Sequence, residues 1–380
     1  MKIDAIDTFC LRAPVETPFT SARGWWYKTK NAMLVRIRTS DGVEGWGEAY
    51  GPADVTSKVI ETLLTPMLLG QDPAQIDVLW HAMYQRVEDY DPQGFAVAAM
   101  SAIDIALWDA FGKVTGQPVH RLLGGAHRTW LQPYATGLYF TKEDGDHVSP
   151  AAEEAQRYRD QGFRGVKMKI ALPVREEIRR VETVREALGE GVELMVDANH
   201  GYDRPDALRL GRAFERMGIT WFEEPISPND LDGYRELRTR IDTPLAGGEN
   251  AFTRFAFAPI IAGHAMDIIQ PDVCCAGGIT EFQRISAMAG AAGVAVVPHV
   301  WGSAVGLYAA LQVMAALPPA PQTWKPSPLW MEYEQTENPF RDKLARTPVT
   351  IQDGAVEIPT GPGLGLEIAE DIIRHYDVRR

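Results

Sequence analysis

Three short apolar runs, each ending in a carboxylate, decide the fold: residues 192–197 read VELMVD, residues 219–223 read ITWFE and residues 244–249 read PLAGGE. Their terminal acids, Asp197, Glu223 and Glu249, follow one another at intervals of 26 residues. An interval of about 25 residues holds one strand and one helix, and strands that alternate with helices form a parallel sheet. The sequence therefore predicts three neighbouring parallel strands whose acids lie at the same end.

The same alternation extends to both sides of these runs. Five further apolar runs have the length of a strand: residues 131–137, 165–170, 267–272, 294–299 and 329–334. Eight parallel strands of this kind predict an α/β fold of the β/α barrel type, which typically occupies ~250 residues.

Residues 1–125 have a different pattern. Two strand-like runs, 32–39 and 43–48, are joined through Asp-Gly, a strong hairpin signal. Helical patterns follow over 54–69, 74–87 and 94–115, and strands followed by helices indicate an α+β domain. We therefore predict an α+β domain over 1–125, a barrel over 126–345, and a segment over 346–380 that packs back on the first domain.

Composition excludes several classes of protein. The chain has 380 residues and a net charge of −13, which argues against a nucleic-acid binder and a basic membrane-surface protein. Its cysteines, Cys10, Cys274 and Cys275, cannot form a disulfide framework, and no signal-peptide pattern opens the chain, so we expect a cytoplasmic location. Residues 285–324 contain no Asp, Glu, Lys or Arg, but glycine and proline interrupt them, which predicts helix, strand and helix in a core and not a membrane span.

The three strand-end acids form a candidate metal site. Barrel active sites lie at the carboxyl ends of the strands, where Asp197, Glu223 and Glu249 would stand side by side and repel one another unless a cation bound between them. Oxygen ligands select a hard ion, so Mg²⁺ is the first expectation and Mn²⁺ the second. The alternative, in which each acid caps the helix after its strand, explains one acid better than three at equal spacing.

One strand earlier, residues 165–170 read GVKMKI. Side chains alternate along a strand, so Lys167 and Lys169 point into the barrel and Met168 points outward. Inward ammonium groups are costly unless they meet carboxylates or an anionic substrate. Their repulsion and desolvation predict a lowered pKa for one of them, which suits a general base; the alternative is a pair of surface lysines on an edge strand.

A second candidate base lies beyond the acids. Asp272 ends the sixth strand and His299 the seventh, so the acid can hydrogen-bond to the imidazole, select its tautomer and raise its basicity. On the eighth strand Glu332 completes the ring, with Glu334 as a close competitor for the same role.

A metal between two bases suits the removal of a proton next to a carboxylate. A Lewis acid that binds the substrate carboxylate stabilises the charge that develops, and Lys167 and a protonated Glu332 would add to that stabilisation. A divalent ion and two lysines would make the pocket locally cationic although the protein is acidic, so we expect a small-molecule carboxylate as the substrate.

These residues resemble the enolase superfamily and, within it, the mandelate racemase subgroup. The resemblance covers essentially the whole chain and implies a modified (β/α)7β barrel of the TIM type, capped by an N-terminal α+β domain that the C-terminal segment completes. It also implies the residue roles: Lys167, Lys169, Asp272, His299 and Glu332 in catalysis, and Asp197, Glu223 and Glu249 on the metal. The muconate-lactonizing subgroup has a lysine on the sixth strand, where this chain has Asp272.

Longer strings resemble the D-galactarolactone cycloisomerases of that subgroup, among them residues 134–137 (YATG), 197–202 (DANHGY), 221–225 (WFEEP), 298–302 (PHVWG) and 338–341 (NPFR). This likeness implies ring opening of a sugar-diacid lactone to a 3-deoxy-2-keto diacid. The same apparatus fits an acid-sugar dehydratase or a racemase or epimerase, and a non-catalytic sugar-acid-binding barrel is the remote alternative.

Specificity is expected partly from the cap. Residues 17–27, where the subgroup has a mobile loop, carry Trp25 and Trp26, which either cover the substrate or pack between the domains. We predict substrate contacts for Trp25, Asn199 and Trp301, and a homo-oligomer between a dimer and an octamer. Asn250 stands where the cycloisomerases are expected to have threonine, which leaves the exact substrate open.

Overall fold

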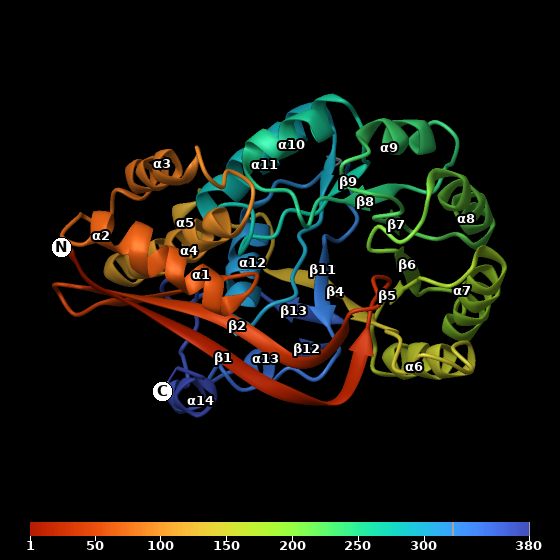
Figure 1. The fold of residues 1–380 in the computed structure, drawn as a ribbon, viewed down its shortest axis with the longest axis horizontal. Helices are drawn as coiled ribbons and strands as arrows, with labels where there is room; N and C mark the ends of the chain where they lie inside the picture. Colours follow the sequence, from red (N-terminus) through yellow and green to blue (C-terminus); the bar gives the residue numbers. More distant parts are fainter. Residues whose placement is uncertain (321–322, 380) are drawn as a thin grey trace.

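The computed structural model describes residues 1–320 and 323–379, and its larger part is a barrel (Figure 1). All eight predicted strands are present, and seven parallel pairings join them in the order β10-β9-β8-β7-β6-β5-β4-β11. Seven are shorter than expected and β4 is one residue longer; the strands are β4 Trp130–Gly137, β5 Gly165–Lys169, β6 Glu193–Asp197, β7 Phe222–Glu223, β8 Leu245–Gly247, β9 Ile268–Ile269, β10 Ala295–Val296 and β11 Trp330–Glu334.

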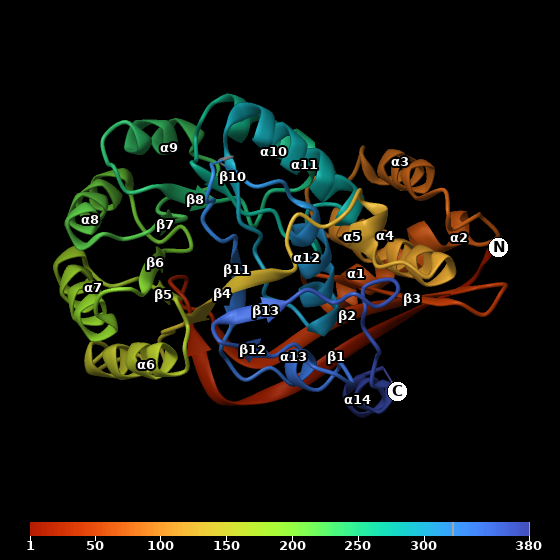
Figure 2. The same cartoon turned by 180° about the vertical axis from the view of Figure 1, so that it is seen from behind.

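A helix follows each of the first seven barrel strands and covers the outside of the sheet (Figure 2), which confirms the (β/α)7β pattern. Helix α8 shows why the sequence folds this way: Asp203 caps its first turn through the Asp206 amide, and Leu210 and Phe214 bury its apolar side against the strands. The seven helices are α6 Ser149–Asp160, α7 Val174–Leu188, α8 Arg204–Met217, α9 Leu231–Arg238, α10 Thr253–Ala262, α11 Gly278–Ala292 and α12 Ala304–Ala316.

The N-terminal domain is an antiparallel sheet covered by helices, as the α+β prediction required. The predicted hairpin is confirmed as β2 paired with β3, and a long strand that the sequence analysis missed, β1, pairs with β2 on its other side. The elements are β1 Ile3–Thr20, β2 Trp26–Thr39, β3 Glu44–Ala49, α1 Ala53–Val59, a π-helical turn η1 Ile60–Leu64, α2 Thr65–Leu68, α3 Ile76–Val87, α4 Phe95–Thr115 and α5 Val119–Leu122.

Helix α4 is the core helix of this domain. It is the one helix in the described residues that is long and apolar enough to cross a membrane, but 83% of its apolar window is buried inside the protein. Strand β3 lies directly on it, because a Cβ at Gly47 would sit 1.9 Å from the Ala102 carbonyl oxygen. The stretch 285–324, which lacks Asp, Glu, Lys and Arg, forms most of α11 and all of β10 and α12, as expected. Residues 321–322 of this stretch lie outside the described residues.

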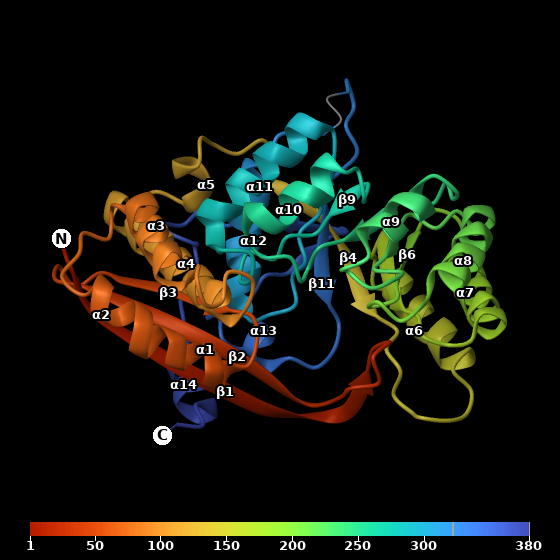
Figure 3. The ribbon, with the colours of Figure 1, turned by 45° about the horizontal axis from the view of Figure 1, so that its top comes forward.

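The tip of the β1–β2 hairpin reaches the barrel (Figure 3). Residues 17–27 were expected to form a mobile loop, and this expectation is wrong for most of them, since β1 extends to Thr20 and β2 begins at Trp26. Thr20 and Phe140, in the loop after β4, exchange backbone hydrogen bonds of 2.8 and 3.0 Å. A ladder contact therefore attaches the hairpin to the barrel mouth.

The C-terminal segment contacts both parts of the molecule. Its strand β13 pairs antiparallel with β4 of the barrel, and Asp377, next to α14, forms a bridge with Leu11 of β1. The limits 1–125, 126–345 and 346–380 stay predictions. The remaining elements are α13 Pro339–Asp342, β12 Ile351–Gln352, β13 Ala355–Glu357 and α14 Glu370–Tyr376.

Candidate active site

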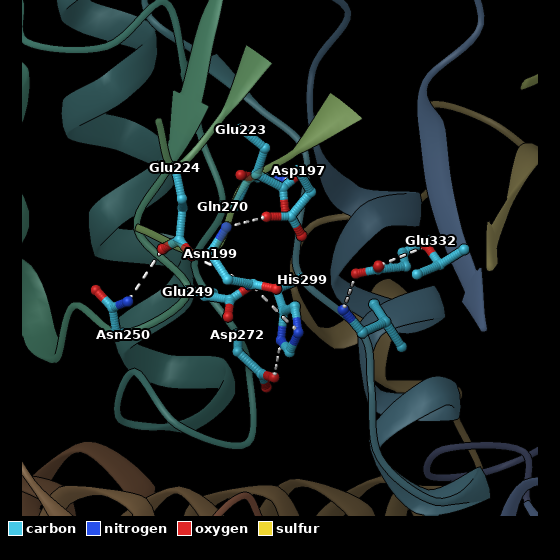
Figure 4. Close-up of polar contacts among 12 residues, drawn as sticks. Asp197, Asn199, Glu223, Glu224, Glu249, Asn250, Gln270, Asp272, His299 and Glu332 are labelled. Carbon is cyan, nitrogen blue, oxygen red and sulfur yellow. Dashed lines mark hydrogen bonds and ion pairs between the residues drawn. The ribbon is translucent and has the colours of Figure 1, made fainter. Parts of the chain in front are cut away.

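Three carboxylates meet at the mouth of the barrel (Figure 4). Asp197 and Glu223 end β6 and β7, and Glu249 follows β8, so three adjacent parallel strands deliver them to one edge. One oxygen from each lies within 4.8 Å of the others. Asp197 and Glu223 are fully buried, whereas the Glu249 side chain is 20% exposed. The cluster therefore has a closed inner side and an outer side open to a ligand.

Burial and mutual repulsion set the charges of this cluster. Burial and the nearby Asp197 raise the pKa of Glu223 to about 7. Burial also opposes ionisation of Asp197, but Lys169 and Lys167 outweigh it and hold the pKa of that carboxyl well below its usual range. Negative charge is thus concentrated where the two lysines meet the triad.

The two lysines of β5 point into the barrel as predicted, and Met168 packs in the cluster beneath the helices. Lys167 Nζ lies 2.7 Å from Glu223 Oε1, 2.9 Å from Glu332 Oε1 and 3.8 Å from Asp197 Oδ2. Lys169 Nζ contacts Asp197 alone among the carboxylates within ion-pair distance in the described residues.

A lowered lysine pKa was expected, and the structure shows the opposite. Burial lowers the pKa of both amines, but the carboxylates outweigh it: Glu223 and Glu332 for Lys167, and Asp197 for Lys169. The pKa of both lysines is therefore raised, because the attraction of the adjacent acids exceeds the repulsion between the two amines.

The acid and histidine predicted on β9 and β10 form a hydrogen-bonded pair. His299 Nδ1 lies 2.7 Å from Asp272 Oδ2, and Nε2 lies 3.5 Å from Glu249 Oε2, so the ring bridges the dyad and the acidic triad. Burial lowers the pKa of the imidazole, but Glu249 and Asp272 outweigh it and raise the pKa of His299 to about 10. The ring is therefore positioned as a proton donor facing the triad.

Glu332 and Glu334 point the same way from β11 but have different neighbours. Glu332 accepts hydrogen bonds from Thr136 Oγ1 at 2.6 Å and the Val300 amide at 3.0 Å, besides its contact with Lys167. Glu334 instead pairs with Lys30 of the cap. The structure thus places Glu332, and not Glu334, among the barrel residues of the site.

The expected protonated state of Glu332 does not fit this environment. Burial raises the pKa of the carboxyl, but Lys167 and His299 outweigh it and lower the pKa to about 2. An ionised Glu332 is an anchor for Lys167 and the Val300 amide.

The backbone is strained next to the triad. Asn199, His200 and Glu224 have φ values of 37°, 65° and 44°. Residues other than glycine rarely adopt this left-handed conformation, and those that do cluster at functional sites. The His200 amide donates to the Glu224 carbonyl at 2.8 Å, and Asn250 Nδ2 lies 3.0 Å from Glu224 Oε1. The strand ends that carry the acids are therefore fastened to one another.

Two amide oxygens at the site have no partner in the described residues. Gln270 donates from Nε2 to Glu223 Oε2 at 2.8 Å, but its buried Oε1 makes no hydrogen bond. The buried side-chain Oδ1 of Asn199 likewise makes no hydrogen bond, while the backbone N–H of Asn199 donates to Asp197 Oδ1 at 2.9 Å. Three carboxylates with unpartnered oxygens beside them fit a hard divalent cation and its water ligands.

Aromatic side chains form the wall between the triad and the cap. The Trp301 ring lies 5.2 Å from the Tyr27 ring, with the Lys30 ammonium 3.7 Å from the Trp301 centroid, and its buried Nε1 has no partner in the described residues. Trp25, by contrast, is 70% exposed at the hairpin tip, with Arg23 at 5.9 Å from its ring. The structure brings Trp301 and Asn199 to the mouth more closely than Trp25.

Sequence reasoning missed two buried side chains of the site. Gln270 lies two residues before Asp272 on the sixth strand, and the alternation of side chains was the signal that would have placed it inside. Glu224 follows Glu223 directly. Its side chain belongs to the site only because its backbone adopts a positive φ, for which a single sequence has no signal.

Comparison with known proteins places this geometry in a family. Residues 5–124 match the family described as mandelate racemase / muconate lactonizing enzyme, N-terminal domain, and residues 150–372 match the family described as enolase C-terminal domain-like. The chain is 42% identical over 376 residues to the D-galactarolactone cycloisomerase of Agrobacterium fabrum, with 99% of each chain covered.

Solved structures agree with these matches. The 3,6-anhydro-D-galactonate cycloisomerase from Zobellia galactanivorans is 38% identical, with a TM-score of 0.89 and 99% of each chain covered. L-talarate/galactarate dehydratase from Salmonella typhimurium LT2, liganded with Mg and L-lyxarohydroxamate, is 30% identical, with a TM-score of 0.88 over 99% of this chain and 93% of that one.

Proposed function

The chain belongs to the mandelate racemase / muconate lactonizing enzyme family of the enolase superfamily, and on that premise we propose that it opens the ring of a sugar-diacid lactone, as a D-galactarolactone cycloisomerase does. The observation that carries this proposal is the order of groups around the mouth. An acidic triad on β6, β7 and β8 is flanked by a lysine pair on β5 and by an Asp–His dyad on β9 and β10. Such an enzyme is a lyase or isomerase that removes a proton next to a carboxylate.

Asp197, Glu223 and Glu249 would hold Mg²⁺, with Mn²⁺ as the second choice for the same oxygen ligands. A bound ion would supply a Lewis acid for the substrate carboxylate, which would stabilise the negative charge that develops as the adjacent proton leaves. Gln270 and Asn199 orient the acids and offer their free oxygens to the ion's water ligands or to substrate hydroxyls.

The lysines have different roles because they have different partners. Lys167 is held by Glu223 and Glu332, so it stays an ammonium ion that stabilises the forming charge. Lys169 is held by Asp197 alone, and a cation bound to that carboxylate would weaken the attraction that keeps Lys169 protonated, so that the amine could take a proton. We assign Lys169 as the base on the β5 side.

His299 acts on the opposite side of the substrate. Its Nδ1 is hydrogen-bonded to Asp272, so Nε2 is the nitrogen that exchanges a proton with the substrate. In lactone opening, the proton next to the free carboxylate leaves and the carbon–oxygen bond at the neighbouring carbon breaks. The ring carboxylate is the leaving group, and the resulting enol becomes a 3-deoxy-2-keto diacid.

Dehydration of an open acid sugar is the alternative, since one of the related structures is a dehydratase. In that reaction hydroxide leaves in place of the carboxylate, and His299 would protonate it. A racemase or epimerase would instead return the proton to the opposite face.

A survey of acid sugars and their lactones in D₂O with Mg²⁺ tests the proposal. We expect solvent deuterium in the product and a keto diacid formed from a lactone but not from the open diacid. A keto product from the open diacid alone would select the dehydratase. No exchange and no product from any compound, with metal bound, would refute an enzymatic role.

The base assignments have their own test. His299→Asn and Lys169→Ala should each abolish turnover while Mg²⁺ affinity stays nearly unchanged, because neither side chain is a metal ligand. Calorimetric titration with Mg²⁺ measures the affinity, and a wild-type rate in either variant would exclude the two-base assignment.

Other features of the proposal follow the sequence. Asn199, Trp301 and Trp25 are proposed to contact the substrate, and the enzyme is proposed to work in the cytoplasm as a homo-oligomer. All three cysteines are free and buried, in agreement with a reducing compartment.

A further inference from the structure

The end of strand β3 in the cap touches the two barrel segments that carry the Asp–His dyad. Glu48 lies on this strand, only 2% exposed, between the cap and helix α12. His299 lies four residues before Ser303, the N-cap of α12. A side chain of the cap thus lies next to the segment that delivers the catalytic imidazole.

Glu48 accepts three hydrogen bonds from the first turn of α12. The Ser303 amide donates to Oε1 at 2.8 Å, the Ser303 hydroxyl donates to Oε2 at 2.6 Å, and the Gly306 amide donates to Oε2 at 2.7 Å. Ser303 Oγ in turn accepts from the Val305 amide at 3.1 Å. The carboxylate therefore satisfies free donors of the helix N-terminus, where negative charge is favourable.

Two glycines allow this close approach. A Cβ at Gly302 would lie 2.6 Å from Glu48 Oε1, and a Cβ at Gly306 would lie 2.9 Å from Oε2 and 2.8 Å from Cys274 Sγ. Each of these distances is shorter than real Cβ contacts permit. The backbone of the segment is thus seated directly on the carboxylate.

Tyr50, two residues further along the chain, contacts the loop that carries Asp272 and the ring of His299. Its amide donates to the Cys274 carbonyl at 3.0 Å, and the Cys274 amide donates to Asp272 Oδ1 at 2.7 Å. Its ring meets the His299 ring edge-on at 5.6 Å. The cap therefore positions the acid and the imidazole through two neighbouring residues.

Glu48 is a costly group to bury. No lysine or arginine in the described chain forms an ion pair with it, and burial raises the pKa of the carboxyl to about 7 in spite of its hydrogen bonds to Ser303 and Gly306. A buried carboxylate without a cation is costly, and its three hydrogen bonds to the first turn of α12 offset only part of that cost.

We propose that Glu48 is a positioning residue that fixes the segment 299–306 and thereby the contact between His299 and Asp272. The inference rests on the proposed function for the role of His299, but the placement of the imidazole is measurable without a substrate. It assigns to the cap a direct part in the chemistry, beyond covering the mouth.

Glu48→Gln is the test variant. The glutamine side chain has one acceptor oxygen where the carboxylate has two. Its NH₂ group would therefore face a backbone N–H, either that of Ser303 or that of Gly306, and this donor would lose its hydrogen bond. Asp109→Asn is the control: Asp109 is a buried acid of the same domain that accepts from the Trp46 and Leu364 amides at 2.9 and 2.8 Å and pairs with Lys113 at 2.6 Å.

Two measurements on the folded protein need no substrate. Hydrogen–deuterium exchange of residues 299–306 should rise about tenfold in Glu48→Gln, as expected for the loss of a buried hydrogen bond, and should stay at the wild-type rate in Asp109→Asn. The low-field proton resonance of His299 Nδ1–H, identified by its loss in Asp272→Asn, should shift or broaden in Glu48→Gln and persist in the control. If Glu48→Gln does not fold, Ser303→Ala removes the hydroxyl that donates to Glu48 and accepts from the Val305 amide, and the His299 resonance is then the measurement that is read in the same way.

Unchanged exchange and an unchanged resonance in Glu48→Gln would overturn the proposal, and so would equal changes in both variants. Where turnover is found, kcat should fall about tenfold with KM nearly unchanged, because the lost hydrogen bond acts on the imidazole and not on the metal ligands. If wild type turns over no acid sugar, the proposed function fails, while exchange and the resonance still decide the role of Glu48.

Discussion

Asp104 makes the stability of this protein depend on pH in a way that one substitution should remove. This carboxyl lies on α4, fully buried, and accepts hydrogen bonds from the Thr280 amide at 2.9 Å and the Thr280 hydroxyl at 2.6 Å. Burial raises its pKa from 3.8 to about 7, although the bonds to Thr280 oppose the shift. The folded protein therefore keeps a proton on Asp104 at pH values where the unfolded chain has lost it.

The sign and size follow from proton linkage. A raised carboxyl pKa contributes stability that is fully present below pH 3.8 and is lost as the pH rises to about 7. The shift spans about three pH units at 1.36 kcal/mol per unit, so up to about 4 kcal/mol of the free energy of unfolding is lost across this window. Asp104→Asn cannot ionise, and its amide can accept from the Thr280 amide and donate to the Thr280 hydroxyl oxygen.

Urea unfolding at pH 5, 6, 7 and 8, followed by tryptophan fluorescence, measures the effect. The variant should gain on wild type by about 1 kcal/mol per unit from pH 5 to pH 7 and by little more from pH 7 to pH 8, because the wild-type loss ends near the folded pKa and the other groups titrate alike in both proteins. Asp41→Asn, an exposed acid in the β2–β3 turn, controls for the loss of a surface charge. A constant difference between Asp104→Asn and wild type from pH 5 to pH 8 would refute the reasoning.

Three further substitutions test the triad and the cap. Asp197→Asn should weaken Mg²⁺ binding by about 10-fold to 100-fold or more in calorimetric titration, because removal of a ligand carboxylate costs no less than the loss of an outer-shell partner; unchanged affinity would exclude Asp197 as a ligand. Gly47→Ala should lower the free energy of unfolding by about 1–3 kcal/mol or more, since its Cβ would lie 1.9 Å from the Ala102 carbonyl oxygen, and an unchanged melting temperature would contradict that packing. Lys30→Met should cost up to about 3–5 kcal/mol by removing one of the two cations paired with the buried Glu334, the other being Arg341 at 3.6 Å, and the double variant with Glu334→Gln should recover part of the loss; additive losses in urea unfolding would show that the pair is not coupled.

The barrel could be predicted because its repeat is local. Each strand is a short apolar run with a polar residue at its end, so spacing alone placed Asp197, Glu223 and Glu249 on adjacent strands. The alternation of side chains likewise placed both lysines inside. Strand β1 was missed because its 18 residues include Pro14 and Pro18 and bury their side chains irregularly, so that no simple period marks them.

The electrostatic state of the site was not predictable in the same way. Repulsion between Lys167 and Lys169 is visible in the sequence, but the sign of their pKa shifts depends on how many carboxylates lie within ion-pair distance. The roles of Glu48 and Asp104 depend on contacts with residues 255 and 176 positions away. A single sequence does not report pairings of that range.

The arrangement of the acids and of the two candidate bases is compatible with lactone opening, dehydration and epimerisation alike. The acidic triad occupies three contiguous strands, and the two candidate bases, Lys169 and His299, approach from opposite sides. Proton removal is common to all three reactions, which differ in the group that leaves and in the face that is protonated. Trp301 and Tyr27, whose rings lie 5.2 Å apart, form the wall that joins barrel to cap. Exchange of the residues on this wall, and not of the triad or the lysines, is therefore the change that should convert one activity into another.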